Sequence, residues 1–195
     1  MKKVIGILVG SLRKESFSKK IAKALIAMAP EDFEFKIIPL DNLPIYNQDF
    51  DDFNNVPESY IEFRESIKAI DGVIFVTPEY NRSVPAVLKN ALDVGSRPKG
   101  KNAWSGKPAA IFSNSPGNIS GFGANHHLRQ SLVFLNLPTM QQPEVYITKA
   151  NELFDEKSDI KESRTKDFLQ NAVNAYIVWF NKNAVAKPQT LSVLI

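Results

Sequence analysis

The sequence contains, from residue 72 to residue 85, the stretch Gly72-Val73-Ile74-Phe75-Val76-Thr77-Pro78-Glu79-Tyr80-Asn81-Arg82-Ser83-Val84-Pro85. Its unbroken apolar first half is typical of a strand that is buried on both faces of a parallel sheet. The amphipathic stretch that follows, 86–95, predicts a helix with Pro85 near its first turn. The segment therefore predicts a strand, a polar loop and a helix, and ligands bind at such junctions in open α/β sheets.

A second junction of the same kind lies near the start of the chain. The apolar residues 4–9 lead into the polar loop 10–18, and a helical pattern follows. Strand and helix patterns then alternate: strands are expected at 4–9, 33–38, 73–77, 108–113 and 144–147, and helices at 18–29, 58–70, 86–95, 123–135 and 159–181. This alternation predicts the α/β class, with a flavodoxin-like, doubly wound five-stranded parallel sheet and helices on both faces.

The length of 195 residues predicts one domain, which we place at 1–183, followed by a C-terminal tail at 184–195. Residues 39–57 are rich in Pro, Asp and Asn and predict an irregular segment. The neighbouring Asp51 and Asp52 are expected to be solvated there.

Composition narrows the functional classes. The chain has no cysteine, so disulfides and thiolate metal sites are excluded, and the adjacent His126 and His127 lack partner ligands for a metal site. The net charge is only +3, and the basic residues are scattered among acidic ones. This distribution argues against a nucleic-acid partner. No apolar stretch reaches membrane-spanning length and no signal peptide is visible, so we expect no membrane partner and a cytoplasmic location.

The loop 10–18 has the composition of a phosphate site. Ser11, Ser16 and Ser18 supply hydroxyls, Arg13 supplies a guanidinium, and the helix that follows presents unpaired amides. The loop lacks both the P-loop pattern and the dinucleotide fingerprint, which favours a mononucleotide phosphate over a pyrophosphate. Alternatively, Ser16 or Ser18 only caps the helix. Spacing alone does not decide between the two interpretations.

The loop 77–85 suits a planar ring. Its two prolines make it rigid, so that Glu79, Asn81 and the backbone can present hydrogen-bonding groups to a flat heterocycle, with Tyr80 beside it. In the alternative, Ser83 caps the following helix and Glu79 is solvated. The ends of the first and third strands adjoin at the switch point of this fold, so the two loops together indicate a phosphorylated flavin.

These residues resemble the NADPH-dependent FMN reductase family, in particular its chromate and quinone reductase branch. The resemblance rests on Gly10-Ser11-Leu12-Arg13 with Ser16 and Ser18, on Thr77 to Asn81 with Ser83-Val84-Pro85, on Leu88 to Asp93, on Ser105 to Pro108, on Ser115-Pro116-Gly117 and on His127 to Gln130. It implies FMN as cofactor and NADPH or NADH as co-substrate. The residues that it assigns to FMN are Ser11, Arg13, Ser16, Phe17 and Ser18 at the phosphate, Pro78, Glu79, Tyr80, Asn81 and Ser83 at the ring, and Ser115, Pro116 and Gly117 at the other edge.

The resemblance also implies an activity. A hydride would pass from NAD(P)H through bound FMN to small-molecule acceptors such as quinones, free flavin, azo compounds or chromate, with the cofactor supplying the chemistry and no side chain identified as catalytic. Related enzymes form homodimers or homotetramers, and Arg129 and Glu144 match positions of a tetramer contact. The alternative on this fold is a non-enzymatic electron carrier of the flavodoxin type. The sequence does not distinguish NADPH from NADH.

Overall fold

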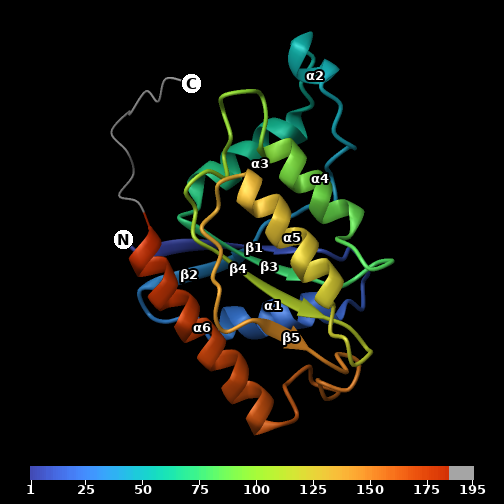
Figure 1. Ribbon diagram of the computed structural model, residues 1–195, viewed down its shortest axis with the longest axis vertical. Coiled ribbons are helices and arrows are strands. Elements are labelled where there is room, and N and C mark those ends of the chain that lie inside the picture. The colour runs from blue at the N-terminus through green and yellow to red at the C-terminus, as the bar shows by residue number, and fades with distance from the viewer. Residues whose placement is uncertain (185–195) are drawn as a thin grey trace.

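The computed structural model describes residues 1–184, in which five parallel strands alternate with helices (Figure 1). The strands are β1 (Lys3–Val9), β2 (Phe33–Ile37), β3 (Gly72–Thr77), β4 (Ala109–Asn114) and β5 (Val145–Ile147). The helices are α1 (Phe17–Ala27), α2 (Asp49–Asp52), α3 (Glu58–Ala69), α4 (Ala86–Gly95), α5 (Phe122–Phe134) and α6 (Ser163–Asn183). The strand order is β2-β1-β3-β4-β5, which confirms the predicted flavodoxin-like sheet.

The sheet is built around its first strand. β1 pairs in parallel with β2 on one side and with β3 on the other, so that Ile7 lies opposite both Ile37 and Ile74. All residues of β3 and β4 are buried, as the continuous apolar runs predicted. Because every pair is parallel, the loops that follow the strands emerge at one edge of the sheet.

Helices cover both faces of the sheet and enclose a hydrophobic cluster on each (Figure 1). α1 and α6 pack on one face, where the apolar side of α6 contributes Leu169, Val173 and Tyr176. α3, α4 and α5 pack on the other, where Tyr60 and Ile67 of α3 are fully buried. These are the faces that the helical spacing predicted.

The last helix begins at Ser163, whereas the sequence pattern predicted a start at residue 159. The Asp155 carboxylate explains the difference, because it accepts backbone N–H bonds from Lys157 and Asp159, each at 2.9 Å. Such Asx-type bonds compete with helix formation. Ser158 also has a left-handed φ of 67°, which turns the chain before α6 can start. Of the predicted tail at 184–195, all but the first residue lies outside the described residues.

The segment 39–57 contains the short helix α2, which the sequence did not predict and which projects from the body in Figure 1. It is attached through Arg64 of α3, whose guanidinium donates to both carboxylate oxygens of Asp51 at 2.7 and 2.8 Å. Arg64 also donates to the carbonyl of Val94 at 2.9 Å. The expectation that Asp51 is solvated is therefore wrong, since its side chain is 6% exposed.

Candidate functional site

A cleft opens at the carboxyl edge of the sheet, beyond β1, β3 and β4. Asn114 lines it, together with ten of the thirteen predicted FMN-site residues. The ten predicted residues are Ser11, Arg13, Ser16, Phe17, Ser18, Pro78, Glu79, Tyr80, Ser115 and Pro116. The other three predicted residues, Asn81, Ser83 and Gly117, are not part of its lining. The cleft measures about 120 Å³. Ligand pockets commonly span about 300–1,000 Å³, so it encloses one part of a larger ligand.

The two predicted loops meet at Gly10. Its amide donates to the carbonyl of Val76 at 2.9 Å, which continues the pairing of β1 and β3 into the loops. A side chain at this position would place its Cβ 3.0 Å from Cδ of Pro78. A side chain here would press on the neighbouring loop, so glycine favours the close approach of the phosphate loop (10–18) to the ring loop (77–85).

The phosphate loop presents buried hydroxyls and the exposed cations Arg13 and Lys14, of which Arg13 lines the cleft. Ser11, Ser16 and Ser18 are nearly inaccessible, and the Ser16 hydroxyl accepts the Lys19 amide at 3.2 Å as the N-cap of α1. Ser16 therefore caps α1. Within residues 1–184, Arg13 makes no ion pair or hydrogen bond through its exposed guanidinium. An anion here would meet the positive end of α1 together with an unpaired guanidinium.

Asn114 is the site residue that the sequence analysis did not assign. It ends β4, is 2% exposed, and donates its amide hydrogens to the Ser18 hydroxyl at 3.0 Å and the Thr77 carbonyl at 3.1 Å. It therefore ties the start of α1 to the end of β3. A polar residue at the end of an apolar strand, directly before the assigned Ser115, was the signal available for it.

The ring loop folds into a tight hairpin at its tip. Tyr80 and Ser83 exchange backbone hydrogen bonds of 3.1 and 2.9 Å, and the two residues between them, Asn81 and Arg82, have positive φ angles of 49° and 64°. Positive φ at both central positions is the signature of a type I′ turn. Asparagine is favoured there, but arginine is not, so the second position carries backbone strain.

The ring loop is fastened to α5 by two side chains. Glu79 is 11% exposed, and its carboxylate accepts the Ala124 amide in the first turn of α5 at 3.0 Å. The Ser83 hydroxyl lies 3.0 Å from Nδ1 of His127. Helix α4 has Pro85 as its N-cap with no side-chain cap bond. The alternative of a solvated Glu79 and a helix-capping Ser83 is therefore wrong.

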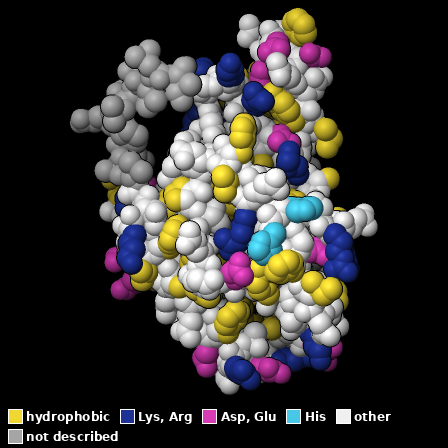
Figure 2. All heavy atoms as spheres, in the orientation of Figure 1, with side chains coloured by type: hydrophobic (Ala, Val, Ile, Leu, Met, Phe, Trp, Pro, Cys, Tyr) yellow, Lys and Arg dark blue, Asp and Glu magenta, His cyan; other side chains and the backbone are white. Residues whose placement is uncertain are grey.

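The residues that the resemblance placed in a subunit contact come from two segments, Arg129 from α5 and Glu144 from the position before β5. Figure 2 shows both histidine side chains at the surface, among hydrophobic, basic and acidic side chains. Nε2 of His126 lies 3.1 Å from the Tyr146 hydroxyl, and the carboxylate of Glu144 lies 3.9 Å from Nε of Arg129. Burial and a hydrogen bond with Glu144 raise the pKa of Tyr146 to about 12, so this phenol is neutral at physiological pH.

Comparisons with known proteins show the family to which the chain belongs. The profile of the NADPH-dependent FMN reductase family matches residues 3–152. The chain is 52% identical to a quinone reductase of Pseudomonas putida over 92% of this chain and 95% of that one. It is 42% identical to a 2-hydroxy-1,4-benzoquinone reductase of a Burkholderia species, over 93% and 98% of the two chains.

A solved structure is similar over nearly the whole fold. The flavoenzyme NAD(P)H:(acceptor) oxidoreductase FerB from Paracoccus denitrificans superimposes with a TM-score of 0.88 at 37% identity, covering 94% of this chain and 100% of that one. The chain belongs to the NADPH-dependent FMN reductase family. It is an FMN-dependent NAD(P)H oxidoreductase, which confirms the predicted enzyme, cofactor and co-substrate over the electron-carrier alternative. Within residues 1–184, no helix has the length and hydropathy needed to cross a membrane.

Proposed function

We propose that this enzyme reduces quinones with electrons from NAD(P)H, and that its FMN binds in the cleft between the phosphate loop and the ring loop. We infer the binding site from the unpaired guanidinium of Arg13, which lies beside Ser11, Ser16 and Ser18 at the start of α1. When bound, FMN would accept a hydride from NAD(P)H and deliver electrons to the acceptor. The chain's own residues bind and orient it.

The donors of the cleft fit a phosphate group. Arg13 would form a charge-assisted pair with it, and the Ser11 hydroxyl and the free amides of α1 would donate to its oxygens. Ser18 is held in place by Asn114, with 3.0 Å between the amide nitrogen and the hydroxyl oxygen. The small volume of the cleft, about 120 Å³, matches a role in enclosing this end of the cofactor.

Exposed aromatic rings at the cleft and on the adjoining start of α5 support a flat, apolar acceptor such as a quinone. Tyr80 lines the cleft and is 49% exposed, and Phe122 at the start of α5 is 50% exposed. The hydrogen bond from Ala124 to Glu79 joins the two segments that carry these rings. Aromatic side chains favour stacking with planar rings, and two of the relatives are named as quinone reductases.

A homo-oligomer is part of the proposal, with Glu144 at the contact. Arg129 already bonds within its own chain, donating to Asn125 and to the Met140 carbonyl at 3.0 Å each. The Glu144 side chain is 35% exposed and is held only loosely, since its carboxylate lies 3.9 Å from Nε of Arg129 and 4.0 Å from Nε2 of His126, so it can also meet a second copy. If so, light scattering during gel filtration should show a smaller assembly for Glu144→Ala than for the unchanged protein. Equal masses would contradict a contact through Glu144.

The proposed function is tested by the visible absorbance of the flavin. Purified protein is mixed with FMN, NADPH or NADH is added without oxygen, and 1,4-benzoquinone follows. We expect FMN binding, bleaching of the flavin band by a reduced nicotinamide, and recovery with the quinone. Binding without bleaching by either nicotinamide would contradict the reductase, and bleaching without recovery would contradict quinone as the acceptor.

A further inference from the structure

A basic segment leads from the phosphate loop into α1. Residues 13–23 contain five cations and one carboxylate, so the segment has a net charge of +4. The whole sequence has a net charge of +3, which leaves −1 for all other residues together. Basic residues are scattered over the chain as a whole, but the excess positive charge is concentrated here. A surface of one sign attracts partners of the opposite sign.

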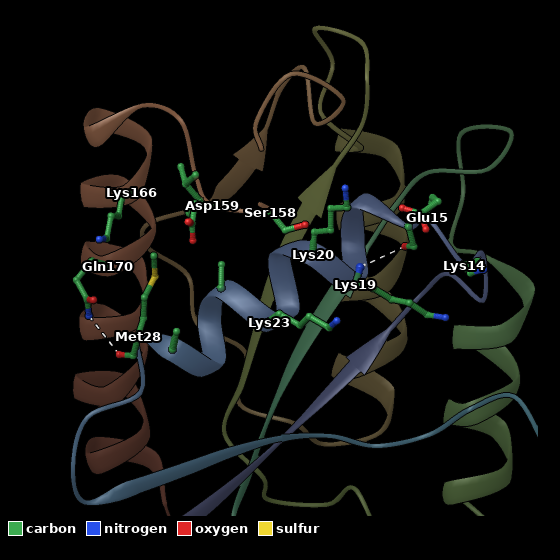
Figure 3. Close-up of a pocket in the computed structure, with 14 residues that line it drawn as sticks. Lys14, Glu15, Lys19, Lys20, Lys23, Met28, Ser158, Asp159, Lys166 and Gln170 are labelled. Carbon is green, nitrogen blue, oxygen red and sulfur yellow. Dashed lines mark hydrogen bonds between the residues drawn. The ribbon is translucent and has the colours of Figure 1, made fainter. Parts of the chain in front are cut away.

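Two hollows flank α1 and share two of its lysines. The larger one is a groove of about 940 Å³ between α1, the first half of α6 and residues 158–160 (Figure 3). The smaller one, of about 290 Å³, lies between α1 and the end of β2. Lys19 and Lys23 line both hollows, so their linings form one continuous surface, which we call the α1 face. Figure 3 shows Lys20 and Lys23 projecting from α1, with Lys166 contributed by α6.

Most lysines of the α1 face have no partner inside the protein. Among the described residues, four of their ammonium groups make no ion pair or hydrogen bond; these are Lys14, Lys20, Lys23 and Lys166. The fifth, Lys19, donates to the Leu12 carbonyl at 3.2 Å. The face also holds three carboxylates, Glu15, Asp41 and Asp159. The lysines outnumber them, so the face presents free ammonium groups to an anionic partner.

Apolar side chains lie among these charges at the smaller hollow. Val9, Ile38 and Leu40 form its buried lining, and each is at most 5% exposed. Leu12 and Ile37 line the same hollow but are 50% and 37% exposed. Exposed apolar side chains beside lysines suit the surface of a bilayer. Apolar groups there enter the acyl boundary, while ammonium groups lie near anionic headgroups.

We propose that the α1 face docks on an anionic phospholipid surface, and that the docked enzyme takes lipid-soluble quinones from the membrane. The second part rests on the proposed function. Leu12 of the smaller hollow directly precedes Arg13 of the cleft, and Ser11 lines both, so docking brings the cleft beside the bilayer. The sequence predicted no membrane partner because no segment is long enough to span a bilayer, but a contact at the surface needs no span.

Co-sedimentation with vesicles tests the docking without any turnover. The full-length chain is mixed with vesicles of phosphatidylcholine alone, or of phosphatidylcholine with anionic phosphatidylglycerol. Lys20→Ala/Lys23→Ala removes two lysines that have no internal partner, and Leu12→Ser removes an apolar side chain. The control Lys99→Ala/Lys101→Ala removes the same charge from exposed positions outside both hollows. Circular dichroism verifies that each variant is folded.

We expect the unchanged chain and the control to bind the anionic vesicles only, and to be released by salt. The affinity of Lys20→Ala/Lys23→Ala should be about tenfold or more weaker, and that of Leu12→Ser should also fall. Docking is overturned if the unchanged chain binds neither vesicle, or if both double variants lose affinity equally. It is also overturned if Leu12→Ser binds like the unchanged chain and a short DNA duplex binds as tightly as the vesicles, since the face would then recognise any polyanion.

Steady-state kinetics at saturating NADPH test the supply of quinones. The KM for a quinone with a long isoprenoid tail, dissolved in anionic vesicles, should rise about tenfold in Lys20→Ala/Lys23→Ala. The KM for water-soluble 1,4-benzoquinone should stay the same. An unchanged KM for the tailed quinone would overturn its uptake from the membrane. A failure of the proposed function is recognised separately, because the unchanged chain would then not reduce 1,4-benzoquinone, whereas sedimentation with vesicles does not depend on turnover.

Discussion

The carboxylate of Glu79 in the ring loop accepts the backbone N–H of Ala124 in α5 at a distance of 3.0 Å. The bond satisfies one of the amides that the first turn of a helix leaves unpaired, and it does so across 45 residues of sequence. A negative charge at this end of α5 is also favoured by the helix dipole. Glu79 therefore holds two walls of the active-site region together.

The variant Glu79→Ala should be less stable because the Ala124 amide loses its partner. We expect the free energy of unfolding in urea, measured without FMN, to fall by about 1–2 kcal/mol. Glu79→Gln keeps an acceptor but loses the charge, so its loss should be smaller. The control Glu65→Ala removes an exposed ion pair with Lys68 and should change stability by less than about 0.5 kcal/mol. Equal losses for Glu79→Ala and Glu65→Ala would contradict the assigned role.

The variant Arg13→Ala should bind FMN more weakly, since it removes the charge-assisted contact that we propose for the phosphate. We expect the Kd from a fluorescence titration to rise about tenfold or more. Arg97→Ala, an exposed arginine outside the cleft, serves as the control for charge. An unchanged Kd in Arg13→Ala would remove the phosphate assignment.

The variant Arg82→Gly should be more stable than the natural sequence. Arg82 has a φ of 64° at the second central position of the hairpin turn, where Asn-Gly is the favoured pair. Relief of this strain should raise the free energy of unfolding by about 0.5–1 kcal/mol. The variant also loses the ion pair between the Arg82 guanidinium and the Glu79 carboxylate, which are 3.4 Å apart. This loss should contribute little, because the Arg82 side chain is 71% exposed.

Arg82→Val is the matched comparison for the turn, because it removes the same guanidinium but places a β-branched residue at positive φ. Its free energy of unfolding should fall by about 1 kcal/mol or more. The difference between the two variants isolates the backbone contribution. Similar stabilities for the glycine and valine variants would show that the turn is not strained.

The free energy of unfolding should decline at alkaline pH, in part because the Tyr146 phenol ionises. Burial and Glu144 raise the pKa of this phenol to about 12, whereas an unfolded tyrosine titrates near about 10. Between these values the unfolded chain loses a proton that the folded chain keeps. The contribution of Tyr146 is therefore complete below pH 10 and disappears as pH rises through 12.

Tyr146→Phe removes this titration, so its free energy of unfolding should fall less steeply from pH 10 to pH 12 than that of the unchanged chain. Denaturant curves at several pH values measure the two slopes. Below pH 9 the two proteins should show parallel dependences. Identical slopes above pH 10 would contradict the raised pKa.

The sequence predicted the sheet well because local and global signals agree there. β3 and β4 are continuous apolar runs, and the parallel order follows from the alternation of strands and helices. The start of α6 was predicted four residues early because its charged approach looks helical, whereas the Asp155 carboxylate directs the backbone into a turn. Short local bonds of this kind are weakly encoded in residue spacing.

The site was only partly predictable. The serines, Arg13 and the ring loop are recognisable by composition, since each lies directly after an apolar strand. The roles of Glu79 and Ser83 could not be predicted, because their partners Ala124 and His127 come from a helix far away in sequence. The lysines that α1 and α6 contribute to one groove were likewise not predicted, since Lys20 and Lys166 line the same hollow only in the folded chain.

The interior position of β1 has a consequence for biosynthesis. This first strand to leave the ribosome needs β2 and β3 as its two neighbours, so it stays incompletely paired until Thr77 has been synthesised. The opposite wall of the cleft, Asn114 to Pro116, emerges still later. A nascent chain shorter than this lacks one wall of the cleft, and so the proposed FMN site is complete only after at least about the first three-fifths of the chain has been synthesised.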